Sequence, residues 1–71
     1  MKEFAIIYEK GPRNWAAYVP DLPVCLAVGD SLEEVQAVIT RAAASYIETL
    51  KEQGEPIPEP VTRVGSLAIG V

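Results

Sequence analysis

Histidine is absent from this chain of 71 residues, and cysteine occurs only once. Without histidine, the Ser-His and Cys-His pairs of nucleophilic enzymes cannot be assembled. The common zinc sites that combine cysteine with histidine are missing for the same reason, and a single cysteine excludes a framework of disulfide bonds. We therefore interpret the lone thiol, Cys25, as a small buried apolar side chain rather than as a reactive group.

The sequence also lacks a long apolar run and an excess of basic residues. No stretch approaches the roughly twenty apolar residues that span a bilayer, and the N-terminus does not have the pattern of a secretory signal peptide. These absences predict a cytoplasmic protein without a membrane association. The net charge of −4 argues against binding through nucleic acid phosphates. The same charge suits a basic protein partner, although acidity also serves solubility alone.

Apolar residues, in contrast, are abundant, at 49% of the chain. That fraction is high for a single small domain over residues 1–71, because such a domain has a large surface for its volume. The excess predicts that part of the apolar surface is covered in a homodimer or a larger assembly.

The N-terminal half of the chain alternates between β-forming and turn-forming residues. We predict a first strand over Phe4–Tyr8, central in the sheet or covered on both sides, and a hairpin turn within Lys10–Arg13 that leads to a second strand over Trp15–Val19. Two prolines then flank an Asp-Leu insert and turn the chain. A short apolar strand over Cys25–Val28 follows, and we expect its neighbours to cover it.

A single helix is predicted over Leu32–Gln53. Ser31 and Glu34 have the spacing of a capping box at its start, and Gly54 is placed as the residue that ends it. After a stiff proline-rich connector, alternation over Val61–Val71 predicts a bent or edge strand whose main chain could pair with another chain. The predicted fold is therefore α+β, in the order β-β-β-α-β, with one long helix packed on one face of an antiparallel sheet.

Two aromatic residues, Trp15 and Tyr18, are candidates for contact with a partner, because aromatic side chains anchor interfaces. They have opposite parity on the second strand, so one faces the core and the other faces away. A cluster of carboxylates suits a divalent cation, but turn formation, helix capping and the helix dipole account for most of its members. Those carboxylates belong to Asp21, Asp30, Glu33 and Glu34. We predict no metal site, no cofactor and no catalytic residues.

Together, several of these positions resemble the HicB-like antitoxin family. Its members typically show a Trp, then Pro-Asp-Leu-Pro-Gly-Cys, then Gly-Asp-Thr and a Glu on the helix. The corresponding positions here are Trp15, Val19–Pro23, Cys25, Gly29–Ser31, Glu34 and the exit Ile57–Pro60. Val24 stands where the family usually has glycine, so a turn that needed a positive φ would have to be built differently in this chain.

The resemblance implies a fold related to part of the ribonuclease H architecture. It also implies an antitoxin that binds a small basic messenger-RNA endoribonuclease, HicA, and covers its substrate surface and catalytic histidine. Under this hypothesis Trp15, Tyr18 and Asp21 are the candidate partner-binding residues. Many family members carry a C-terminal DNA-binding domain; we expect none here, and no direct binding to DNA.

Two other functions stay open at this stage. An orphan domain of the same fold would act as an oligomeric binding module for another protein or a small ligand, without a toxin partner. A remnant of a metal-dependent nuclease would need several carboxylates that converge on divalent metals. The sequence favours the antitoxin, which has no catalysis of its own.

Overall fold

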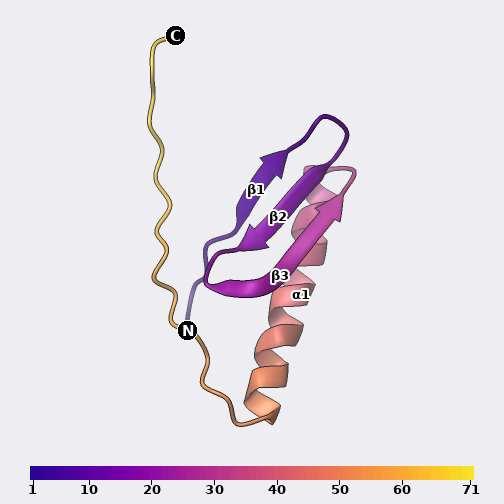
Figure 1. Cartoon of the computed structure of the whole chain (residues 1–71), viewed down its shortest axis with the longest axis vertical. Helices are drawn as coiled ribbons and strands as arrows, with labels where there is room; N and C mark the ends of the chain where they lie inside the picture. The colour runs from indigo at the N-terminus through magenta and orange to yellow at the C-terminus, as the bar shows by residue number, and fades with distance from the viewer.

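The structure is a computed structural model that describes residues 1–71 and contains three strands followed by one helix (Figure 1). The elements are β1 (Ile7–Lys10), β2 (Trp15–Val19), β3 (Leu22–Gly29) and α1 (Leu32–Glu52). The strands form one antiparallel sheet in the order β1-β2-β3, and α1 packs along one face of it. The predicted α+β fold, with an antiparallel sheet and one long helix, is confirmed.

The first strand differs from its prediction in its first residue and in its place in the sheet. It begins at Ile7 rather than Phe4 and lies at an edge of the sheet rather than at its centre. The cause is the hairpin register, in which Lys10 pairs with Trp15 and Ile7 with Tyr18. Ile6 falls opposite Val19, the last residue of β2, and the residues before Ile6 extend beyond the end of that strand.

The turn between β2 and β3 is tight, and β3 is longer than the predicted Cys25–Val28. Pro20 and Asp21 make the turn, and Leu22 already pairs with Val19. The prolines thus set the turn as predicted, but the chain re-enters the sheet sooner than the sequence pattern indicated.

An irregularity in the β2–β3 pairing explains the position of the second proline. The register shifts between Tyr18 and Val19, so β3 bulges between Leu22 and Leu26. Pro23 lies in this bulge on an edge strand, where its missing N–H removes no ladder hydrogen bond. No residue other than glycine has a positive φ, so Val24 replaces the family glycine without backbone strain.

The start of α1 is fixed by side chains, as the sequence indicated. Ser31 Oγ accepts a hydrogen bond from the N–H of Glu34 at 3.1 Å, and the Glu34 carboxylate accepts one from the N–H of Asp30 at 2.9 Å. Gly29, the last residue of β3, lies close to this first turn. A Cβ at this position would lie 3.2 Å from Glu34 Cγ and 3.3 Å from the backbone nitrogen of Val35, so there is little room for a side chain. The strand and the helix therefore meet closely.

The end of α1 is a Schellman motif. Gly54 has a φ of +70°, the left-handed conformation that glycine adopts without a Cβ penalty. Its N–H donates to the carbonyl of Lys51 at 3.1 Å, and the N–H of Glu55 donates to the carbonyl of Leu50 at 2.9 Å. Gly54 therefore ends the helix as predicted.

The core lies between α1 and the facing side of the sheet. Val35 and Ile39, which are one helical turn apart, are both fully buried at 0% exposure. They pack against small and medium apolar side chains of β2 and β3. The whole buried cluster is Ala17, Val19, Leu22, Cys25, Ala27, Val35 and Ile39.

The strand that we predicted over Val61–Val71 is wrong for the single chain. These residues contain no strand, and they run past the N-terminus and then away from the sheet (Figure 1). A β-strand requires a neighbour for its hydrogen bonds, and no strand of the same chain pairs with this segment. The order observed within one chain is therefore β-β-β-α.

Candidate functional site

The side of the sheet that faces away from α1 is an uncovered apolar surface. Tyr8 and Ala17 pair on the helix side, so their neighbours in the same ladder, Ile7 and Tyr18, point the other way, opposite Leu26 of β3. We call this surface the open face. Its apolar members are Ile7, Ala16, Tyr18, Leu26 and Val28.

The open face is exposed most strongly along β3. Leu26 is 69% exposed and Val28 is 64% exposed, whereas Cys25 and Ala27 between them are buried under the helix. Large apolar side chains left in water on one contiguous surface are typical of a site where another molecule binds.

The two candidate aromatic residues have opposite orientations, as their parity predicted. Trp15 shares the side of Ala17 and packs against the core cluster. Tyr18 lies on the open face and is half-buried. Tyr18 is therefore the aromatic residue available to a partner, whereas Trp15 fills the edge of the core.

Asp21, the third candidate, is occupied by a contact within the chain. One carboxylate oxygen accepts a hydrogen bond from the N–H of Thr62 and the other accepts one from the Thr62 hydroxyl, both at 3.1 Å. The carboxylate thus ties the C-terminal segment to the β2–β3 turn. The structure places Asp21 near the Tyr18 end of β2 but does not bring it together with Trp15, which lies at the other end of that strand and on its other face.

The groups that carry chemistry do not converge. No group of three or more His, Cys, Asp or Glu side chains is arranged to hold a metal ion. Glu34 is committed to capping the helix. Burial raises the pKa of the Cys25 thiol, which lies inside the core and is therefore a poor nucleophile at neutral pH.

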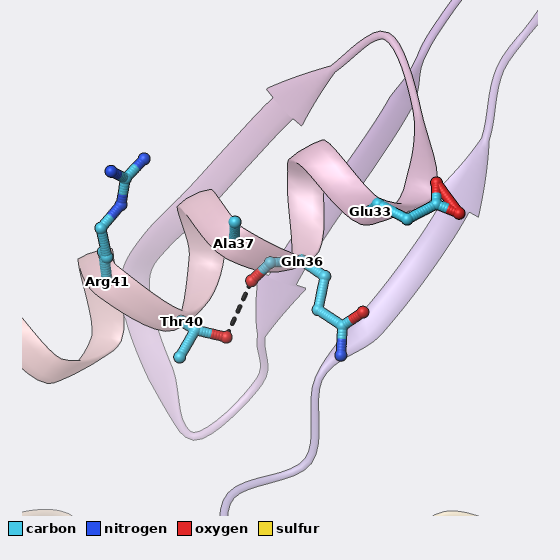
Figure 2. Close-up of a pocket in the computed structure, with 5 residues that line it drawn as sticks. All are labelled: Glu33, Gln36, Ala37, Thr40 and Arg41. Atoms are coloured by element: carbon cyan, nitrogen blue, oxygen red, sulfur yellow. Dashed lines mark hydrogen bonds between the residues drawn. The ribbon is translucent and has the colours of Figure 1, made fainter.

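A shallow hollow lies on the solvent side of α1 (Figure 2). The Thr40 hydroxyl donates to the carbonyl of Gln36 at 2.7 Å and is thereby satisfied within the helix. The charged side chains at the two ends, Glu33 and Arg41, point away from each other in the view. This hollow is a polar helix surface without a constellation for catalysis.

The sequence interpretation did not predict the exposed apolar side chains of β3, Leu26 and Val28. We expected the neighbours of this strand to cover it because every residue of Cys25–Val28 is apolar. A signal was nevertheless present, since the residues that prove buried, Cys25 and Ala27, are smaller than the exposed Leu26 and Val28. Within Cys25–Val28, size alternation rather than polarity distinguishes the helix side of the strand.

Comparisons with known proteins identify one related family. Residues 4–68 match the family described as "HicB_like antitoxin of bacterial toxin-antitoxin system". A comparison with curated proteins gives no significant match, and neither does a comparison with solved structures. No helix of the structure combines the length and the apolar character that are needed to cross a membrane.

Proposed function

The chain belongs to the HicB-like antitoxin family, and from this premise we propose that it binds a small basic messenger-RNA endoribonuclease of the HicA type. The match over residues 4–68 is the observation that carries the proposal. The antitoxin occludes the substrate surface and the catalytic histidine of the toxin, and it performs no catalysis itself. It acts in the cytoplasm, where its partner meets messenger RNA.

Charge supports a basic partner. The chain has a net charge of −4, and the last turns of α1 and the segment after it expose Glu48, Glu52 and Glu55. The one nearby base, Lys51, lies 3.6 Å from Glu48 in an exposed pair, which contributes little to stability. An acidic surface of this kind accelerates encounter with a basic protein, and added salt screens the attraction.

The open face supplies the apolar part of the proposed interface. Tyr18 stands between Ile7 and Leu26 across the three strands, so an aromatic side chain is flanked by aliphatic ones. Interfaces gain most of their affinity from such central aromatic and aliphatic contacts, whereas charged rims mainly set specificity and association rate. We place Tyr18 at the centre of the toxin contact.

Co-expression with the product of an adjacent open reading frame tests the function. We expect a small basic product that contains histidine, arrests growth when expressed alone, and is both neutralised by this chain and co-purified with it. Absence of toxicity and of a complex would contradict the antitoxin proposal. It would favour the alternative, an orphan oligomeric binding module of the same fold.

Substitutions on the open face test the contact. Tyr18→Ala should weaken toxin binding by about 30-fold, since truncation of a central aromatic contact costs about 2 kcal/mol or more, and Leu26→Asp should abolish rescue of growth. Gln36→Ala, on the solvent side of α1, is the matched control and should rescue normally. Full rescue by both open-face variants would show that the toxin binds elsewhere.

A further inference from the structure

The solvent-accessible surface of the single chain is larger than that of a compact monomer of the same mass. The accessible area is 5586 Å², whereas a compact monomer of 7.7 kDa exposes about 4,300 Å². The radius of gyration is 13.9 Å, against about 11 Å for a compact chain of this length. The excess area, roughly 1,250 Å², exceeds the about 800 Å² that one partner buries in a typical stable interface.

The C-terminal segment, residues 61–71, is exposed along most of its length, and we call it the tail. Its large apolar side chains are all exposed: Val61, Val64, Leu67, Ile69 and Val71. The main chain of the tail is almost unpaired, because its hydrogen bonds are limited to Thr62 with Asp21 and a local bond between Val71 and Ile69. Unpaired backbone N–H and C=O groups together with alternating apolar side chains are typical of a strand that has no neighbouring strand to pair with.

The root of the tail is fixed to its own domain. Asp21 binds Thr62 through two hydrogen bonds, and Glu59 of the preceding connector forms an exposed ion pair with Lys2 at 2.7 Å. Thr62 and Val64 border a hollow that is also lined by Phe4, just before β1. Beyond this root the tail leaves the domain (Figure 1), and residues 65–71 can reach roughly 23 Å when extended.

The sheet has two free edges, β1 and β3, and they differ in how readily another strand can pair with them. The β3 edge contains Pro23 and a bulge, both of which obstruct the addition of a strand. The β1 edge has regular register over Ile7–Lys10 and contains no proline. A strand from another chain therefore pairs more readily with β1.

We propose that the tail of one copy adds as a strand to the β1 edge of a second copy, in a reciprocal two-fold exchange. The main chain of the tail supplies the hydrogen bonds, and Leu67 and Ile69 pack their apolar row on the second copy. Ala68 and Gly70, on the opposite parity, allow close approach on the other side. Such a dimer restores the order β-β-β-α-β with the last strand supplied in trans, and it does not depend on any toxin.

The mass of the full chain in solution, measured by light scattering at micromolar concentration, tests the exchange. We expect a dimer for the unchanged protein and a dissociation constant raised tenfold or more by the double substitution Leu67→Asp, Ile69→Asp, with the helical signal of the circular dichroism spectrum unchanged. The control Gln36→Asp, Thr40→Asp adds the same charge on the solvent side of α1 and should stay dimeric. A monomeric unchanged protein, or a dimer indifferent to the tail substitutions, would overturn the proposal.

Cross-linking between chains tests which edge receives the tail. A chain with Glu9→Cys, in β1, is mixed with a chain carrying Ala68→Cys or Gly70→Cys and then oxidised. We expect a disulfide-linked dimer from this mixture and none when Val24→Cys, in β3, replaces Glu9→Cys. The native thiol is buried and serves as an internal control. Linkage through Val24→Cys alone, or through neither, would refute the assignment to β1.

Discussion

Both faces of the sheet carry apolar side chains, yet only one of them is a core. On the helix side, small residues such as Ala17 and Ala27 let Val35 and Ile39 approach until no solvent remains. On the open face, Leu26 and Val28 are large and stay in water. The difference shows that apolar character alone does not distinguish a core from an interface. Along Cys25–Val28, the size of the side chains shows where the helix packs, and the large exposed ones indicate a partner.

The strongest test of this contrast is truncation of one large side chain on each side. Ile39→Ala should lower the free energy of unfolding by about 2–5 kcal/mol, because it leaves a cavity in a fully buried site. Leu26→Ala should change it by less than about 0.5 kcal/mol in the isolated chain, because that side chain is already 69% exposed. Urea denaturation followed by circular dichroism measures both. Equal losses for the two variants would mean that the open face is covered in the free protein.

Thiol chemistry gives a second comparison between adjacent positions of β3. Cys25 lies in the core, and its burial raises the pKa of the thiol. Leu26→Cys would place a thiol one residue further on, on the open face. At neutral pH we expect a thiol reagent to label the native Cys25 about a hundredfold more slowly than the introduced thiol, because labelling of the core requires opening. Peptide-level mass spectrometry distinguishes the two sites.

The same pKa shift predicts a direction for stability. The folded chain binds the thiol proton more tightly than the unfolded chain does, since the pKa of Cys25 is raised on folding. The resulting stability is fully present below the unfolded pKa, about 8.5, and is lost as the pH rises through the folded pKa. A free energy of unfolding that increases across this alkaline range would contradict burial of Cys25. In the labelling experiment, similar rates at Cys25 and at the thiol of Leu26→Cys would contradict it too.

Local rules predicted the elements that depend on local chemistry. The Ser31–Glu34 spacing, the glycine at the helix end and the turn at Pro20 each act through neighbouring atoms, so the sequence alone identifies them. The opposite orientations of Trp15 and Tyr18 likewise follow from strand parity.

Features that depend on distant partners were not predictable in the same way. The register shift beside Val19 depends on how β2 meets β3, and it made β3 longer than the apolar run indicated. The tail has the pattern of a strand but forms none, because that pattern specifies a propensity and not a pairing partner. Asp21 was a candidate for contact with another molecule, and its bond to Thr62 joins residues far apart in sequence.

The smallest expected effect concerns the residue that separates the packed domain from its C-terminal extension. Gly54→Ala would force a Cβ into the conformation at φ +70°, at a cost of about 1–2 kcal/mol, although no atom lies within 4 Å of that Cβ. Gly65→Ala is the matched control, because the same open space surrounds it and its φ is not in the left-handed region. Gly65→Ala should leave the free energy of unfolding, measured by urea denaturation, unchanged. A loss at Gly54 alone would show that α1, and with it the cover of the core, depends on the left-handed helix end. Equal effects at both glycines would instead indicate that the tail is ordered as part of the same cooperative unit.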